Sequence, residues 1–149
     1  MKVYVFPGQG SQSKGMGAEL FDAFPEVTKT ADNILGYSIK DLCLNDPDDL
    51  LKNTKYTQPA LFTVNALTFY NKQKSSEEKP LIVAGHSLGE YNALLAAGAV
   101  DFETGLKLVK KRGELMGNIS GGGMAAIIGM DETKVKEVLS GNNLDTIDI

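Results

Sequence analysis

Hydrophobic and polar positions along the chain predict an alternation of helices with a few short strands. The apolar run at residues 3–6 ends at Pro7 and Gly8, which predicts a strand followed by a close loop. A second continuous run, residues 81–85, has the length of a strand in a parallel sheet that helices cover on both faces. Apolar residues at helical spacing predict helices over residues 18–24, 27–35, 58–68, 88–97 and 102–116. Pro59 is expected in the first turn of the third of these helices.

Three consecutive glycines at residues 121–123 predict a boundary within the chain. Residues 124–129 are expected to form a strand and residues 131–139 a helix, which would begin a second small unit. One strand and one helix cannot bury their own apolar face. The pattern therefore predicts an α/β fold in a chain that looks truncated, with the natural polypeptide continuing beyond Ile149.

Composition excludes several classes of function. The chain has 149 residues, of which 42% are hydrophobic and 23% charged, and no apolar run reaches the length of a membrane span or a secretory signal. A net charge of −4 without a dense basic run argues against nucleic acid as a partner. We do not expect the protein to bind a membrane either. Nothing resembles a metal-ligand cluster. The single cysteine, Cys43, permits no internal disulfide; it is expected to be a buried structural thiol in a cytoplasmic protein.

The clearest chemical motif is Gly-His-Ser-Leu-Gly at residues 85–89, which fits the G-x-S-x-G nucleophile elbow. A strand-like run precedes the motif and an Ala-rich helical segment follows it, as an elbow requires. The turn would expose the Ser87 hydroxyl, and the Leu88 N–H would stabilise an oxyanion. The alternative is that Ser87 belongs to an ordinary structural turn.

His86 is the only histidine in the sequence. A general base must reach the serine hydroxyl at about 3 Å, and adjacent residues at such a turn usually point to different sides. We therefore favour a place for His86 at the wall of a pocket over a role as base. The chain then carries a nucleophile without an evident base, which also suggests a missing C-terminal portion.

Several linked motifs resemble the malonyl-CoA:acyl carrier protein transacylase family. They are Phe-Pro-Gly-Gln-Gly-Ser-Gln at residues 6–12, Gly-His-Ser-Leu-Gly-Glu at residues 85–90, Arg112, Thr-Gln-Pro-Ala at residues 57–60 and Gly-Gly-Met-Ala-Ala at residues 122–126. The segments at residues 21–25 and 35–39 look most like the discrete, trans-acting acyltransferases of polyketide synthases. The likeness covers essentially the whole chain.

This resemblance implies an α/β-hydrolase-like acyltransferase subdomain, of which residues 1–122 are the N-terminal part. Residues 123–149 would begin an inserted ferredoxin-like subdomain, with the active site between the two. Members of the family are nearly twice as long and carry their catalytic histidine in the second half, which has no counterpart here.

The resemblance also implies roles for individual residues. Ser87 would form the acyl-enzyme, and the backbone amides of Gln9 and Leu88 would form the oxyanion hole. Arg112 would pair with the carboxylate of a malonyl group; from the sequence alone, a surface salt bridge is the alternative. Gln9 could instead belong to an ordinary glycine-rich turn. Met116, one helical turn beyond Arg112, would line the acyl pocket or belong to the core.

The implied reaction moves a malonyl group from malonyl-CoA through Ser87 to the phosphopantetheine thiol of an acyl carrier protein. It would serve polyketide biosynthesis, such as antibiotic biosynthesis, or fatty-acid biosynthesis. The coenzyme A thioester is a substrate, so no bound cofactor is expected. One alternative is a hydrolase that clears acyl thioesters from carrier proteins; another is an inactive fragment or docking module.

Overall fold

The computed structural model describes residues 2–75, 80–144 and 146–149. These residues fall into two units, Met1–Ile119 and Ser120–Ile149, and each is described by itself. The larger unit contains, in order, β1 (Val3–Phe6), α1 (Ala18–Ala23), α2 (Pro25–Leu35), α3 (Ile39–Asn45), the 3-10 helix η1 (Pro47–Lys52), α4 (Thr54–Lys74), β2 (Ile82–Gly85), α5 (Gly89–Ala96) and α6 (Phe102–Gly117). The smaller unit contains α7 (Glu132–Gly141).

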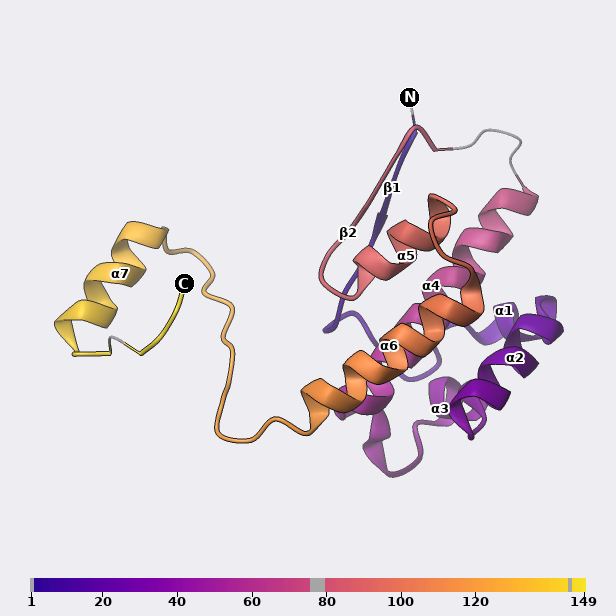
Figure 1. Ribbon diagram of the computed structural model, residues 1–149, viewed down its shortest axis with the longest axis horizontal. Coiled ribbons are helices and arrows are strands. Elements are labelled where there is room, and N and C mark those ends of the chain that lie inside the picture. Colours follow the sequence, from indigo (N-terminus) through magenta and orange to yellow (C-terminus); the bar gives the residue numbers. More distant parts are fainter. Residues whose placement is uncertain (1, 76–79, 145) are drawn as a thin grey trace. The chain divides into compact units, whose positions relative to one another are not determined.

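The two strands form a parallel pair whose register runs from Val3 opposite Ile82 to Phe6 opposite Gly85. Helices α4 and α5 lie on one side of this pair (Figure 1). On that side the rings of Tyr4 and Phe6 meet Phe69 of α4, with centroids 6.3 and 6.1 Å apart. The buried strand face is therefore built from alternate residues of β1.

The opposite face of the pair is exposed, so the expectation of helices on both faces is wrong for the described residues. Val5 is 70% exposed, and Val3 and Ile82 are about half exposed. The apolar run at residues 81–85 has the composition of a strand that helices cover on both faces. The helices that would cover a strand come from other segments of the chain, so the composition of the strand alone does not show whether they are present.

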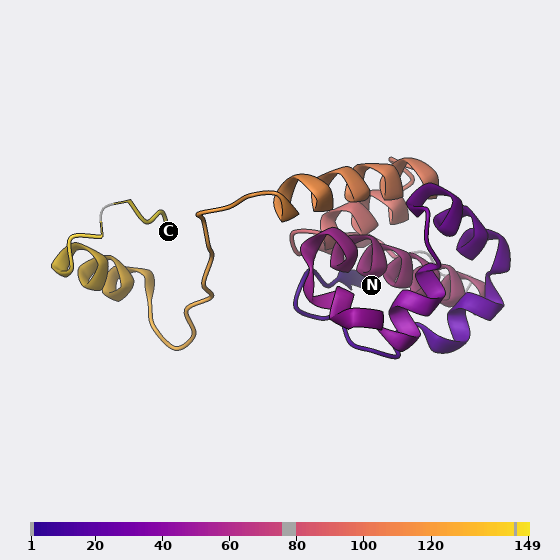
Figure 2. The ribbon, with the colours of Figure 1, turned by 90° about the horizontal axis from the view of Figure 1, so that it is seen from below.

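The core of the larger unit lies mainly between helices. Helix α6 runs beside α4 (Figures 1 and 2), and Phe62 of α4 stacks on Phe102 of α6 with ring centroids 5.7 Å apart. Cys43 is fully buried, as expected of a structural thiol. Burial and, to a lesser extent, the charge of Asp46 raise the pKa of this thiol to about 12.

Helix α4 begins earlier than its apolar pattern indicates. The Asn53 side chain accepts a hydrogen bond from the Lys55 N–H at 3.0 Å and caps the helix there. The Thr57 hydroxyl donates to the Asn53 carbonyl oxygen at 2.9 Å and secures the same turn. Pro59 consequently lies inside α4, and its expected place in the first turn is wrong.

In the smaller unit, the Asp131 carboxylate accepts from the Lys134 N–H at 2.8 Å and caps α7, as the sequence pattern predicts. The strand expected at residues 124–129 is not formed in the described structure. Met124 is 95% and Ile128 93% exposed, and no described segment pairs with this run. A strand needs such a partner for its backbone hydrogen bonds. The assignment of residues 123–149 to a second subdomain stays a prediction.

Candidate active site

Ser87 occupies a sharp turn between the end of β2 at Gly85 and the start of α5 at Gly89. Its φ angle is +52°, in the left-handed region that non-glycine residues seldom adopt, and its side chain is exposed. The Glu90 N–H donates back to the Ser87 carbonyl oxygen at 3.2 Å and begins the helix. The strand, strained turn and helix expected around this serine are therefore present.

The glycines on either side of Ser87 allow backbone segments to approach one another closely. A Cβ atom at Gly85 would lie 2.0 Å from the carbonyl carbon of Gly89, and one at Gly89 would lie 2.1 Å from the carbonyl oxygen of Phe6. A Cβ atom at Gly8 would lie 2.4 Å from the carbonyl oxygen of His86. These contacts bring the loop after β1, which carries Gln9, against the serine turn.

Polar side chains from α4 and α5 hold this loop in place. The Gln9 side chain donates to the Thr54 hydroxyl at 3.1 Å. The Asn65 amide donates at 3.2 Å to both the Pro7 carbonyl oxygen and the side-chain oxygen of Asn92, which is fully buried. The sequence motifs indicate no role for Asn65 or Asn92, although a polar residue among the apolar positions of α4 or α5 is a signal that could have revealed them.

Arg112 of α6 reaches the serine turn. Its Nη2 donates to Ser87 Oγ at 3.0 Å, and its Nη1 donates to the side-chain oxygen of Gln58 at 2.7 Å. Its guanidinium carbon lies 6.0 Å from the centre of the Tyr91 ring. Among the described residues no carboxylate forms an ion pair with Arg112. The structure therefore places an uncompensated guanidinium beside the exposed serine hydroxyl.

Small residues on α6 allow it to lie close to α4 and so carry Arg112 to this position. A Cβ atom at Gly105 would lie 2.6 Å from the Phe62 ring, and one at Gly113 would lie 3.2 Å from the Thr54 carbonyl oxygen. The Asp101 carboxylate caps the start of α6 by accepting from the Thr104 N–H at 2.7 Å, and this hydrogen bond lowers the pKa of Asp101.

The three other predicted site residues differ in their surroundings. His86 is exposed, and its imidazole lies beside Gly8 and forms no hydrogen bond with Ser87 Oγ in the described structure. The Leu88 side chain is fully buried. Its N–H, like that of Gln9, has no acceptor among the described residues. The Met116 sulfur accepts a hydrogen bond from the side-chain nitrogen of Gln58 at 3.1 Å.

Residues 3–144 match the acyl transferase domain family. The chain belongs to this family. Over all 149 residues, this acyltransferase chain is 60% identical to the polyketide biosynthesis malonyl CoA-acyl carrier protein transacylase of Bacillus subtilis, of which it covers 52%. The chain thus spans about half the length of this relative and of the corresponding transacylase of Bacillus velezensis.

Solved structures give the same assignment. The acyltransferase chain is similar to a malonyl CoA-acyl carrier protein transacylase from Burkholderia pseudomallei, with a TM-score of 0.95 and 55% identity over 97% of this chain and 50% of that one. It is also similar to a malonyl-transacylase solved in complex with a type II polyketide synthase acyl-carrier protein. For that chain the TM-score is 0.80 and the identity 40%, over 93% of this chain and 48% of that one. The family identified from the sequence motifs is confirmed.

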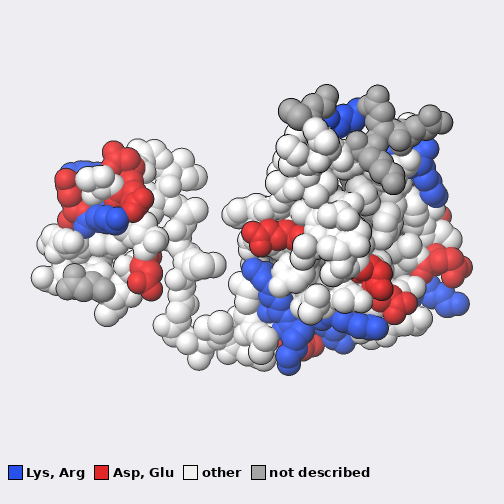
Figure 3. Space-filling model, turned by 45° about the horizontal axis from the view of Figure 1, so that its top comes forward, with Lys and Arg blue, Asp and Glu red and all other residues white. Residues whose placement is uncertain are grey.

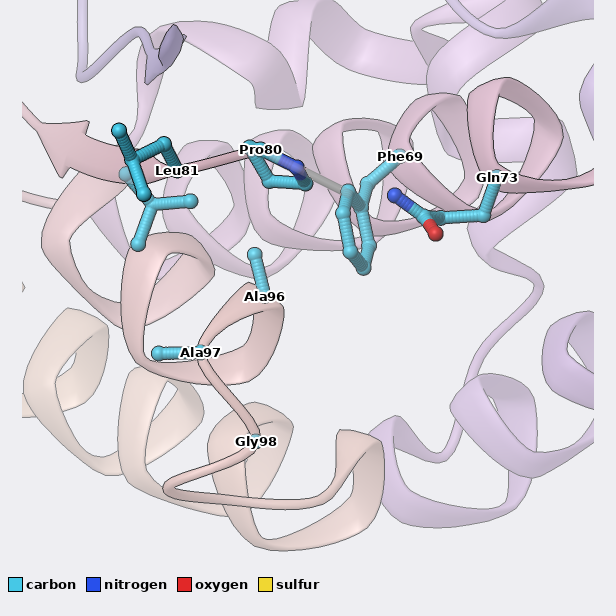
Figure 4. Close-up of a pocket in the computed structure, with 8 residues that line it drawn as sticks. Phe69, Gln73, Pro80, Leu81, Ala96, Ala97 and Gly98 are labelled. Atoms are coloured by element: carbon cyan, nitrogen blue, oxygen red, sulfur yellow. The ribbon is translucent and has the colours of Figure 1, made fainter. Parts of the chain in front are cut away.

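Two hollows on the acyltransferase surface differ in their relation to Ser87. One, of about 520 Å³, is lined by Pro80 and Leu81 just before β2 and by Gly98 after α5 (Figure 4). It lies at the opposite end of both elements from the serine turn. The other, of about 560 Å³, is lined by Met116 and Thr54, which contact Gln58 and Gln9 respectively.

Charges of both signs appear on the face of the larger acyltransferase unit shown in Figure 3, with basic side chains gathered along one edge.

Within the part of the chain that the structure describes, no group of three His, Cys, Asp or Glu side chains is placed to hold a metal ion. None of the described helices combines the length and apolar character needed to cross a membrane.

Proposed function

We propose that this chain carries the nucleophile and the acyl-selecting residue of a malonyl-CoA:acyl carrier protein transacylase acting in polyketide biosynthesis. The observation that carries the proposal is the 3.0 Å contact between Arg112 Nη2 and Ser87 Oγ. It puts a group that recognises carboxylates next to the hydroxyl that would receive an acyl group. Similarity to malonyl CoA-acyl carrier protein transacylases of polyketide biosynthesis supports malonyl as the acyl group and polyketide synthesis as the setting.

In the proposed reaction Ser87 Oγ attacks the thioester carbonyl carbon of malonyl-CoA. A new C–O bond forms, the C–S bond breaks, and coenzyme A leaves as its thiol after taking up the serine proton. The phosphopantetheine thiol of a carrier protein then attacks the malonyl ester, which returns the proton to Ser87. Because the thioesters are substrates, the reaction uses no bound cofactor.

The backbone N–H groups of Gln9 and Leu88 are the proposed oxyanion hole for both steps. Leu88 precedes the first residue of α5, so its N–H lies at the positive end of the helix dipole. The backbone contacts between Gly8 and His86 keep the Gln9 loop beside that helix start. Removing one donor of an oxyanion hole typically slows turnover by about 100- to 1,000-fold.

Arg112 is proposed to bind the malonyl carboxylate. A guanidinium presents two parallel N–H groups that match a carboxylate, and Nη2 would exchange Ser87 Oγ for a carboxylate oxygen when substrate binds. Met116 and the hollow that it lines are proposed to lie along the path of the acyl or pantetheine group. His86 is proposed as part of the pocket wall, and the general base as a histidine in the half of the family domain that this chain does not span.

The finer assignments of fold and setting belong to the same proposal. Residues 1–122 are proposed to belong to an α/β-hydrolase-like subdomain and residues 123–149 to the beginning of a ferredoxin-like one. The acyl carrier protein is the proposed partner, supported by the relative solved with its carrier. The cytoplasm is the proposed location.

The test is transfer of malonyl from malonyl-CoA to a holo acyl carrier protein by the protein in its full native length, with the Ser87→Ala variant as control. We expect malonyl-carrier protein from the unaltered protein and none from Ser87→Ala. Release of free malonate without carrier loading would instead identify a thioester hydrolase. A parallel assay of residues 1–149 alone distinguishes an active unit from a fragment.

A further inference from the structure

Gln58 is a polar residue that is fully buried, and its side chain is hydrogen-bonded to the guanidinium of Arg112. Its oxygen accepts from Arg112 Nη1 at 2.7 Å, and its nitrogen donates to the Met116 sulfur at 3.1 Å. Arginine only donates hydrogen bonds, so the amide oxygen must face the guanidinium and the amide nitrogen must face the sulfur. The orientation of the amide is therefore set on both sides.

This contact also fixes where the guanidinium points. The group is planar and rigid, so anchoring Nη1 on Gln58 leaves Nη2 directed at Ser87 Oγ, 3.0 Å away. The Tyr91 ring, 6.0 Å from the guanidinium carbon, gives a further contact. Gln58 thereby holds Arg112 through one N–H of Nη1 and leaves the remaining N–H groups of the guanidinium for a ligand at the serine.

The charge of the buried partner matters as much as its position. A glutamate has nearly the same shape as Gln58 and would also accept the hydrogen bond, but it would neutralise the guanidinium. An amide oxygen accepts the hydrogen bond and leaves the positive charge uncompensated. No described carboxylate pairs with Arg112, so the full charge is directed toward a group arriving at Ser87.

We propose that Gln58 is a positioning and specificity-determining residue: a neutral buried acceptor that orients Arg112 while reserving its charge for the carboxylate of the acyl group. This inference rests on the proposed malonyl transfer and deepens it. It predicts that a negative charge at position 58 is more harmful to malonyl selectivity than loss of the hydrogen bond itself.

The test compares Gln58→Glu, which keeps the acceptor and adds a charge, with Gln58→Met, which removes the acceptor at similar length. Gln73→Glu is the matched control, because it makes the same change on the same helix, about 22 Å along α4 from position 58. For each variant, kcat/KM is measured with malonyl-CoA and with acetyl-CoA, in the protein of full native length, and folding is checked by thermal unfolding.

We expect the ratio of malonyl to acetyl kcat/KM to fall about tenfold or more in Gln58→Glu, since a charge pair competes directly with the substrate carboxylate. The malonyl-CoA KM should rise, while acetyl transfer changes much less. Gln58→Met should lower the ratio by a smaller factor, and Gln73→Glu should leave it unchanged.

A purely structural role for Gln58 predicts the reverse order, because Glu keeps the hydrogen bond and Met loses it. Wild-type selectivity in Gln58→Glu would therefore overturn the inference while leaving the transferase intact. If Gln58→Glu does not fold, wild-type selectivity in Gln58→Met would overturn it equally. Absence of malonyl transfer by the unaltered protein would instead overturn the proposed function, and this inference with it.

Discussion

The substitution Gly89→Ala tests whether the serine turn depends on close backbone packing. A Cβ atom at position 89 would lie 2.1 Å from the Phe6 carbonyl oxygen, 2.8 Å from its carbonyl carbon and 2.9 Å from the Pro7 carbonyl oxygen. All three are backbone atoms, so no side chain can turn away. Ordinary contact begins near 3.4 Å, so the Phe6 oxygen would have to move by about 1.3 Å.

The cost follows from what that movement breaks. Overpacking of this kind costs about 1–3 kcal/mol. The Phe6 oxygen also accepts the His86 N–H at 3.0 Å, and losing that bond costs about 1 kcal/mol more. Replacing a glycine by alanine in a helix stabilises the helix by about 1 kcal/mol, which offsets part of this loss. Gly89→Ala should therefore lower the free energy of unfolding by about 1–3 kcal/mol.

Urea unfolding followed by circular dichroism measures this difference. Gly117→Ala is the matched control, because it also replaces a helical glycine in the larger unit but its nearest neighbour, the Lys55 Cβ, lies at an ordinary 3.6 Å. The control should keep or raise the free energy of unfolding. A Gly89→Ala variant as stable as wild type would refute the reasoning that this glycine is required sterically.

Three further predictions concern the packing of the larger unit. Gly105→Ala should lower the free energy of unfolding by about 1–3 kcal/mol, measured in urea, because its Cβ would lie 2.6 Å from the Phe62 ring. Asn92→Ala should lower it by about 1–3 kcal/mol, since it removes the buried bond to the Phe62 carbonyl oxygen at 2.9 Å; an unchanged value would contradict this. Cys43 should not react with Ellman's reagent at pH 8 until urea unfolds the protein. The pKa of Cys43 in the folded protein, about 12, exceeds the ordinary value of 9.0. The buried neutral thiol therefore contributes its full share to the free energy of unfolding below about pH 9, and this contribution is lost as the pH rises through 12.

The serine turn could be predicted from the sequence because its requirements are local. Gly85 and Gly89 are needed where backbone atoms lie within about 2 Å of an added Cβ, and Ser87 takes the left-handed conformation that such a turn imposes. The strand before it and the helix after it follow from short patterns of apolar residues. These features do not depend on which distant segments pack nearby.

The proximity of Arg112 to Ser87 came from resemblance to a family, since no spacing along one chain shows that two helices meet. The roles of Gln58, Asn65 and Asn92 were missed for the same reason: each depends on a partner from another element. Two further predictions were wrong, the first for a local reason and the second because a partner segment is lacking. The Asn53 cap moves the start of α4 ahead of the apolar pattern, and residues 124–129 have strand-like composition without a described partner to pair with.

The central claim is that Ser87 accepts a malonyl group, and intact-mass spectrometry tests it most directly. The protein in its full native length is incubated briefly with malonyl-CoA, beside the Ser87→Ala variant. The account predicts a mass increase of one malonyl group that maps to Ser87 and is absent from the variant. No increase, or an equal increase in Ser87→Ala, would contradict it.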